Sequence, residues 1–308
     1  MNKILVTCYA DPDLDGTASA LAYAEFLNKT GRPAVAGVFG EPSVEAEYLL
    51  DRFKIKYPLK LSTTADFEQI VLTDASTLSG LDGNIDPKAV IEIIDHRKVN
   101  EAEKFFKAKV QIELVGAAAT LVAERFFEKQ ISMSSNAAKA LAGAVISNTL
   151  NFHGPVVSDR DRSVFDRLNQ ISALPENFAQ EMFLAKSDLS GKKLFERMRS
   201  DLAGLEFAGQ KIAIVQLEIV GAEGLLAGRG GEIVEILKKI KNEQELAFCF
   251  INIIDLEKFQ NYFLAADDES EKLFEKVLCV VFKNHLAIRK ELLMRKQIVS
   301  LIKKELER

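Results

Sequence analysis

The sequence predicts an α/β protein with two domains, a parallel-sheet domain followed by a smaller α/β domain. In the first half, short apolar runs rich in β-branched residues alternate with helical patterns, which is typical of a parallel sheet. A polar stretch at residues 187–193 interrupts this alternation, which then resumes. A length of 308 residues also favours two domains. We therefore predict domains at residues 1–186 and 194–308, joined by a linker at 187–193.

The first domain is predicted to contain strands that are buried on both faces. Four apolar runs indicate these strands, at residues 3–8, 34–39, 70–73 and 90–94. Between the first two, apolar residues recur at helical spacing, and Gly31 and Pro33 end that helix. Further helices are predicted at residues 117–129, 135–150 and 159–171. The strand–helix–strand order indicates that the strands are parallel.

The second domain repeats the alternation on a smaller scale. We predict strands at residues 211–220 and 246–254, and helices at residues 232–241 and 269–282. No internal repeat accompanies this pattern.

The composition excludes disorder and a membrane-spanning class. Hydrophobic residues make up 48% of the chain and include 20 Phe, enough to form a core. No apolar run approaches the roughly 20 residues that a bilayer helix needs, and no signal-peptide pattern opens the chain. Cys8, Cys249 and Cys279 lie in apolar stretches and are predicted to be reduced core thiols. We therefore expect a cytoplasmic protein without a membrane partner.

The charge is unevenly distributed along the chain. The net charge of −5 makes nucleic acid an unlikely partner, because such binding relies on basic groups. Residues 282–308 nevertheless contain eight Lys or Arg against three Glu, a local charge of +5, so the remainder carries −10. A basic C-terminus and an acidic body suggest an anionic ligand. A solvated basic final helix explains the same charges equally well.

Charged side chains follow three of the predicted strands, at the edge where open parallel sheets bind ligands. They are Asp11, Asp13 and Asp15 after the first strand, Asp74 after the third, and Asp95, His96 and Arg97 after the fourth. One aspartate in such a place is often only a helix cap. Several carboxylates at one edge require a cation, and the imidazole favours manganese, with magnesium or cobalt as alternatives. Two such ions are a common apparatus for attack on phosphorus.

These motifs resemble those of the DHH phosphoesterase superfamily. The matching segments are DPDLDG at residues 11–16, Asp74, the Asp95–His96–Arg97 triplet and GAAAT at residues 116–120. In the second half, SDLSGKK at residues 187–193 and RKQIV at residues 295–299 resemble substrate-binding segments of family II, manganese-dependent inorganic pyrophosphatases. Exopolyphosphatases are a sibling branch.

The resemblance implies two manganese ions, a phosphate-rich small-molecule substrate and a homodimer. It assigns Asp13 to the first ion, Asp15 and His96 to the second, and Asp74 to both. It also implies that the backbone at residues 116–119 approaches the ligand closely. The substrate-binding candidates are Arg97, Lys192, Lys193, Arg295 and Lys296, and the catalytic candidates are Asp74, His96 and Arg97.

Three positions depart from the family pattern. Tyr9 stands where the family has a metal-binding histidine, Arg97 replaces the second histidine of the triplet, and Asn148 replaces an aspartate. A phenol and an amide are poorer ligands for a hard dication than an imidazole and a carboxylate. Asp11 offers an alternative carboxylate, and the Arg97 guanidinium offers bidentate phosphate binding.

The sequence thus leads to one main hypothesis and two alternatives. The main hypothesis is a metal-dependent hydrolase of pyrophosphate or short polyphosphate, which uses a metal-activated water. A phosphodiesterase acting on oligonucleotides or cyclic dinucleotides is one alternative. The other is a non-catalytic protein that binds a phosphorylated ligand, because Tyr9 and Asn148 weaken the metal site.

Overall fold

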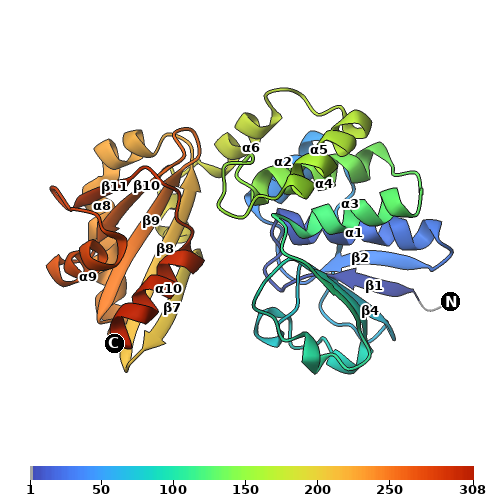
Figure 1. Cartoon of the computed structure of the whole chain (residues 1–308), viewed down its shortest axis with the longest axis horizontal. Helices are drawn as coiled ribbons and strands as arrows, with labels where there is room; N and C mark the ends of the chain where they lie inside the picture. The colour runs from blue at the N-terminus through green and yellow to red at the C-terminus, as the bar shows by residue number, and fades with distance from the viewer. Residues whose placement is uncertain (1–2) are drawn as a thin grey trace. The chain divides into compact units, whose positions relative to one another are not determined.

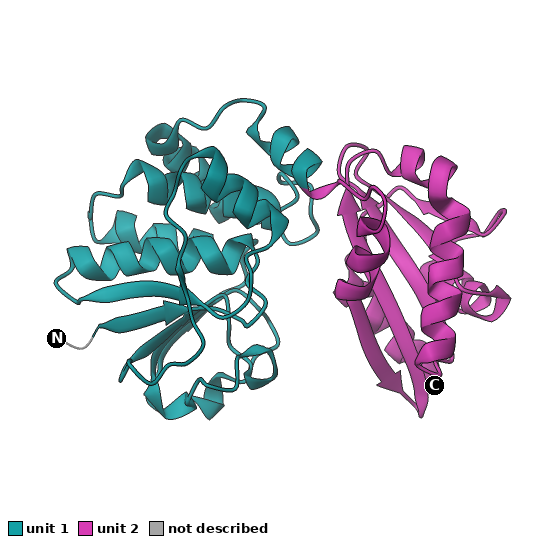
Figure 2. Cartoon of the chain, turned by 180° about the vertical axis from the view of Figure 1, so that it is seen from behind, with its two compact units in different colours: residues 1–185 teal, residues 186–308 magenta. Residues whose placement is uncertain are grey.

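The structure, a computed structural model, describes residues 3–308 and divides into two compact units (Figure 2). The first unit ends at Ala185 and the second runs from Lys186 to Arg308. Residues 187–193, which the sequence assigns to a linker, lie in the second unit, where Lys193 already begins a helix. Among the described residues, none of the helices has both the length and the apolar character needed to cross a bilayer.

The first unit contains the predicted parallel sheet. Its six strands are β1 (Ile4–Thr7), β2 (Ala34–Val38), β3 (Leu59–Lys60), β4 (Ile70–Thr73), β5 (Val90–Asp95) and β6 (Lys109–Ile112). All neighbours pair in parallel, in the order β3-β2-β1-β4-β5-β6. The four predicted strands are therefore confirmed. The sequence missed β3 and β6 because these edge strands are short and partly or fully exposed, so they carry no apolar run.

Helices cover one face of this sheet and irregular chain covers the other. The helices are α1 (Leu14–Lys29), α2 (Val44–Arg52), α3 (Ala118–Glu128), α4 (Ser135–Asn148), α5 (Asp159–Ser172) and α6 (Phe178–Lys186). Figure 1 shows α1 and α3 against the sheet, with α4 and α5 lying over them. On the opposite face, Ile85 and Phe105 from the connecting segments pack on Leu72 and Ile93 of the strands. Three short 3-10 helices lie in these segments, at residues 78–80, 87–89 and 102–104.

The order of the strands fixes where a ligand site forms. The chain direction across the sheet reverses between β1 and β4, which lie side by side. In open parallel sheets the carboxyl ends of the strands at such a reversal diverge and leave a crevice. The segments after β1, β4 and β5 therefore meet at one edge of the first unit.

The second unit is built on a mixed sheet. Its strands are β7 (Leu202–Phe207), β8 (Gln210–Ile219), β9 (Phe248–Asp255), β10 (Gln260–Ala265) and β11 (Leu286–Arg289), in the order β11-β10-β9-β8-β7. Its helices are α7 (Lys193–Ser200), α8 (Ala222–Glu243), α9 (Asp268–Leu278) and α10 (Arg295–Leu306). The pair β8 and β9 is parallel and the other pairs are antiparallel.

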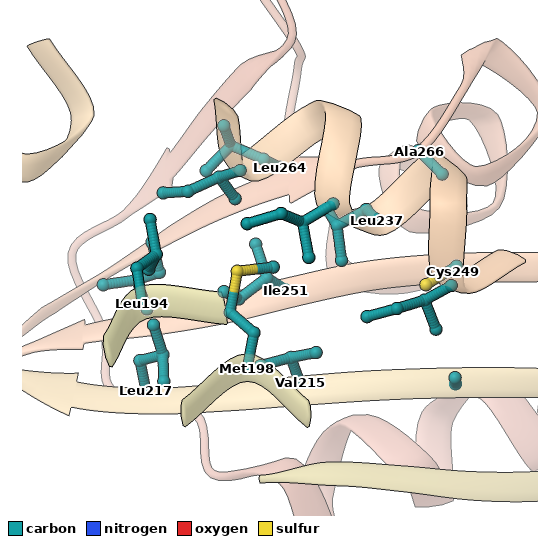
Figure 3. Close-up of a cluster of buried hydrophobic side chains, with 14 of the residues drawn as sticks. Leu194, Met198, Val215, Leu217, Leu237, Cys249, Ile251, Leu264 and Ala266 are labelled. Carbon is teal, nitrogen blue, oxygen red and sulfur yellow. The ribbon is translucent and has the colours of Figure 1, made fainter. Parts of the chain in front are cut away.

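Two separate apolar clusters hold the second unit together. On one face, Met198 of α7 and Leu237 of α8 pack on Val215 and Ile251 of the sheet (Figure 3). On the other face, helices α9 and α10 cover the sheet through side chains that include Phe274 and Ile298. Since both faces are covered, the smaller unit has its own core.

Two expectations for the second unit need correction. Helix α8 begins at Ala222 rather than at residue 232, because four glycines in its first half hide the helical pattern. Cys279 was predicted to be a core thiol, but it is exposed and lies just past the end of α9. Cys8 and Cys249 are buried and free, as predicted.

Candidate metal centre

The segment after β1 enters α1 through two aspartates with different roles. Asp13 is the N-cap of α1, and its Oδ1 accepts a hydrogen bond of 2.8 Å from the amide of Gly16. Asp15 lies in the first turn of the helix and is fully buried. A buried carboxylate needs several donors or a cation, so Asp15 is the stronger candidate for a function beyond capping.

Asp74 follows β4 in a conformation that aspartate adopts at a cost. Its φ of 54° is left-handed, and its amide donates to the carbonyl of Ile94 at 2.8 Å. The residue is 2% exposed. Strained and buried polar residues of this kind concentrate at functional sites, since the surrounding structure must hold them in place.

His96 follows β5 and is oriented by hydrogen bonds at both its backbone and its ring. The carboxylate of Asp95 accepts a hydrogen bond of 2.7 Å from the His96 amide. Ring Nδ1 lies 2.9 Å from the carbonyl of Val115, which selects the tautomer protonated at Nδ1. Nε2 then faces two carboxylates, 3.2 Å from Asp74 Oδ1 and 3.9 Å from Asp15 Oδ2.

This arrangement fits one divalent ion. One ligand atom from each of Asp15, Asp74 and His96 lies within 4.8 Å of the others. Asp74 Oδ1 is buried and accepts no hydrogen bond from the described residues. In the tautomer fixed by Val115, Oδ1 and His96 Nε2 present lone pairs to each other, so only a proton or a cation relieves the contact. Carboxylate and imidazole ligands suit manganese.

The electrostatics of the metal-free centre follow from burial and close contact. Burial tends to lower the pKa of His96, but the close contact with the charge of Asp74, together with Asp15, raises it to about 9. Burial and the charge of Asp74 raise the pKa of Asp13 to about 7. Burial opposes ionisation of Asp74, yet Arg97 and His96 lower its pKa. Without metal, these shifts favour a protonated His96 beside an ionised Asp74.

Asp15 is held by donors from two helices. The amides of Ala118 and Ala119, at the start of α3, donate to its carboxylate at 2.7 and 2.8 Å. Asn148, the last residue of α4, donates through its side-chain amide at 2.6 Å. The N-terminus of α3 thus faces a negative charge, as its dipole favours, and that charge is the carboxylate of Asp15. Asn148 faces Asp15 as a hydrogen-bond donor.

Asp161 is a residue of the site that the sequence analysis missed. Its buried carboxylate accepts hydrogen bonds from the Gly116 amide at 2.8 Å and the Thr120 hydroxyl at 2.6 Å. A Cβ atom on Gly116 would lie 2.9 Å from Asp161 Oδ2, so this close approach requires glycine. The capping box of α5, formed by Ser158 and Asp161, was the signal in the sequence. Asp161 thus positions the segment that holds Asp15.

Arg97 and Tyr9 form a second group on the other side of Asp74. The Arg97 guanidinium lies 4.6 Å above the Tyr9 ring, and Nη2 is 3.1 Å from Asp74 Oδ2. Nη1 donates to the backbone carbonyl of Asp74 and lies 3.4 Å from Asp95 Oδ1. The Tyr9 hydroxyl is 2.9 Å from Thr77 Oγ1.

A small pocket of about 80 Å³ adjoins this group. It is lined by Cys8, Tyr9, Asp11, Pro12, Asp13, Gly16, Asp74 and Arg97. Asp11 is exposed at its rim. Burial, followed by the charges of Asp13 and Asp74, raises the pKa of Cys8, so this thiol stays protonated.

The basic candidates of the second unit lie at two helix starts. Lys192 and Lys193 are exposed at the beginning of α7, and Lys193 pairs with Asp188. Arg295 and Lys296 begin α10, and Arg295 Nη1 donates to the carbonyl of Asp201 at 2.6 Å. Lys193 begins α7, and Asp201 directly follows its last residue. The length of α7, about 12 Å, therefore separates Lys193 from the contact between Arg295 and Asp201.

Three amide side chains on neighbouring strands hold the segment before α10, and the sequence analysis missed them. Asn252 and Asn261 donate to the carbonyl of Leu293 at 3.0 and 2.8 Å. Gln216 accepts from the amide of Arg295 at 2.6 Å. Their signal was an amide side chain next to an apolar run: Gln216 follows KIAIV, Asn252 lies within FCFINII, and Asn261 precedes YFLA. They hold the start of α10, at Arg295, against the sheet, so they act as positioning residues.

The second unit also has a larger pocket of about 600 Å³, but its charges do not suit an anion. Among the side chains that line it, Glu235, Asp267, Asp268 and Glu269 outnumber Lys238. A cluster of Asp268, Glu271 and His285 lies beside it, with Asp268 and His285 exposed. Exposed groups of this kind remain hydrated without an ion.

In the metal-free protein, we expect the stability of the first unit to fall as the pH rises from 6.5 to 9. The pKa of His96 is raised from its ordinary 6.5 to about 9, so its stabilisation is complete below pH 6.5 and is lost through pH 9. The shift corresponds to a free energy on the order of 3 kcal/mol. Denaturant unfolding in chelator should show this loss by tyrosine fluorescence, since four of the five tyrosines lie in this unit.

Two variants separate His96 from other titrating groups. His96→Gln should flatten the pH dependence, whereas His153→Gln, which replaces an exposed histidine of the same unit, should retain it. Equal slopes for the wild type and His96→Gln would contradict the assignment.

Comparisons with known proteins cover nearly the whole chain. Residues 3–147 match the model of the DHH family, N-terminal domain, and residues 180–305 match the model of the DHHA2 domain. A probable manganese-dependent inorganic pyrophosphatase of Clostridium acetobutylicum is 30% identical over 297 residues, which cover 96% of this chain and 95% of that protein. The manganese-dependent inorganic pyrophosphatase of Bacillus subtilis is 29% identical, with 97% of each chain covered.

A solved structure agrees at the level of the fold. A Methanococcus jannaschii protein assigned to the family II inorganic pyrophosphatases superposes with a TM-score of 0.77. The comparison covers 99% of this chain and 100% of that one, at 24% sequence identity.

Proposed function

The chain belongs to the family of manganese-dependent inorganic pyrophosphatases, with a DHH and a DHHA2 domain, and from this premise we propose that it hydrolyses phosphoanhydride bonds. The proposed substrate is pyrophosphate or a short polyphosphate, and the proposed cofactor is manganese. The observation that carries this proposal is the buried contact between Asp74 Oδ1 and His96 Nε2, beside Asp15, at the carboxyl edge of the parallel sheet.

In this proposal Asp15, Asp74 and His96 hold the ion. A divalent ion at such a site supplies Lewis-acid chemistry, because it polarises a phosphoryl oxygen and lowers the pKa of water. The protein keeps the ligands in place through the second layer of contacts: Val115 fixes the tautomer of His96, and the amides of α3 orient Asp15. Asp13 serves α1 as its cap and lies beside the site.

The basic groups of the second unit provide the remaining charge for a polyanionic substrate. We propose that Lys192, Lys193, Arg295 and Lys296 neutralise phosphate oxygens, as cations do in phosphoryl transfer. The amide side chains of Gln216, Asn252 and Asn261 keep Arg295 at its place. Arg97 differs, because both of its terminal nitrogens already contact Asp74 and it therefore neutralises that carboxylate.

Location and assembly complete the proposal. Three free cysteines suit a reducing compartment, which supports the cytoplasm. A homodimer is proposed from the family resemblance, and sedimentation velocity of the full chain measures it directly.

Phosphate release with added manganese tests the function. We expect rapid release from pyrophosphate with manganese and none after chelation. Release from tripolyphosphate alone would move the substrate to longer polyphosphates. Cleavage of bis(p-nitrophenyl) phosphate in place of both would favour the phosphodiesterase.

One specific observation favours the non-catalytic alternative. Asn148 and Arg97 both direct hydrogen-bond donors at the carboxylates of the centre. If isothermal titration shows pyrophosphate binding while no substrate is cleaved, the protein is a phosphate-ligand binder.

A further inference from the structure

We propose that Arg97 is a built-in cation that replaces one of the two expected metal ions, so that the centre holds a single divalent ion. This inference rests on the proposed function, because it concerns the same site. The sequence predicts two ions, and the contacts that Arg97 makes within the first unit are the reason to expect only one.

Arg97 is bound as a permanent partner of Asp74. Its Nη2 is 3.1 Å from Asp74 Oδ2, and its Nη1 donates to the backbone carbonyl of the same residue. The guanidinium also lies over the Tyr9 ring at 4.6 Å and contacts Asp95 at 3.4 Å. An arginine fixed on three sides keeps its position and its charge.

The two oxygens of Asp74 therefore face different partners. Oδ2 is neutralised by Arg97, whereas Oδ1 lies 3.2 Å from His96 Nε2 and accepts no hydrogen bond from the described residues. A dication on Oδ2 would have to approach a guanidinium that is already in hydrogen-bond contact, and like charges at that distance repel strongly. A dication on Oδ1 meets His96 and Asp15 instead.

The other groups expected at the first ion are engaged elsewhere. The Tyr9 hydroxyl is 2.9 Å from Thr77 Oγ1 and 3.2 Å from the amides of Ser76 and Thr77. Asp13 Oδ1 caps α1 through Gly16. With the Arg97 guanidinium in place these residues do not form a second ion site, while the set formed by Asp15, Asp74 and His96 does fit one ion.

The test is the number of manganese ions bound by each chain. After loading and removal of free metal, elemental analysis of the full-length protein should give one ion per chain. Electron paramagnetic resonance should show the six-line spectrum of isolated Mn(II). Two ions with an exchange-coupled spectrum would overturn the inference, even if pyrophosphate is hydrolysed and the proposed function stands.

Substitutions at Arg97 test its role as the replacing cation. Arg97→Ala removes the charge and should raise the stoichiometry from one ion to two, whereas Arg97→Lys keeps the charge and should remain at one. Arg167→Ala is the matched control, because Arg167 is an exposed arginine over the Phe127 ring in the same unit. One ion in folded Arg97→Ala would overturn the inference. Should that variant fail to fold, the wild type and Arg97→Lys still decide.

An absence of bound manganese in the wild type would have a different meaning. It would overturn the manganese part of the proposed function, and the single-ion inference would fall with it. The phosphate-release assay on the same preparation distinguishes this outcome from a site that holds two ions.

Discussion

Asp74→Asn is expected to lower manganese-dependent phosphate release by roughly a thousandfold or more. The carboxylate of Asp74 contacts both the imidazole of His96 and the guanidinium of Arg97, at 3.2 and 3.1 Å. The asparagine amide has the same shape but lacks the negative charge that neutralises Arg97, a protonated His96 and a bound metal ion. Initial rates at saturating manganese and pyrophosphate provide the measurement.

The same substitution should weaken manganese binding. Removing a residue that only orients a metal ligand typically weakens metal affinity by about 10–100-fold. Asp74 is itself a proposed ligand, so its loss should have a larger effect. We therefore expect the dissociation constant for manganese to rise by more than about 100-fold. Asp66→Asn is the control, because it removes an exposed carboxylate from the same unit. Full activity in folded Asp74→Asn would refute the proposed centre.

The parts of the fold that the sequence predicts are those whose signal is local. Strands β1, β2, β4 and β5 are buried on both faces, so each leaves an apolar run that identifies it. Strand β3 has two exposed residues, and the glycines of α8 dilute its helical pattern. Their structure depends on neighbours that are distant in the sequence.

The candidate site divides in the same way. Asp15, Asp74 and His96 were predictable because each follows a strand of the same sheet, so the topology alone brings them together. The contacts that determine their chemistry come from elsewhere in the chain. Asp161 is tied to Gly116 across 45 residues, and Arg97 turns toward Asp74, whereas the sequence suggested a phosphate ligand.

The three departures from the family pattern acquire a common physical account. Tyr9 supports the guanidinium of Arg97, and Arg97 neutralises one oxygen of Asp74. Asn148 donates to Asp15 in a place where a carboxylate would repel it. As a result, the carboxylates of the site need less positive charge from a bound metal ion. The protein therefore depends less on metal to keep these carboxylates close together.

That account predicts opposite effects of Asn148→Asp in the absence and presence of manganese. The Asn148 amide donates to Asp15 at 2.6 Å, so an aspartate removes a donor and places two carboxylates in contact. In chelator we expect the free energy of unfolding to fall by about 2–4 kcal/mol at pH 7.5. With manganese the new carboxylate becomes a ligand, and affinity should rise by about tenfold or more.

Asn148→Ala distinguishes the added charge from the lost hydrogen bond. It should destabilise the metal-free protein by only about 1–2 kcal/mol and should leave manganese affinity without any gain. Thermal unfolding with and without manganese compares the three proteins in one experiment. The difference between the melting temperatures with and without manganese should be largest for Asn148→Asp. Without manganese the new carboxylate repels Asp15 and lowers the melting temperature, and with manganese it binds the ion and raises the melting temperature. An unchanged difference would mean that residue 148 lies outside the reach of the ion, and that Asn148 serves only to hold Asp15.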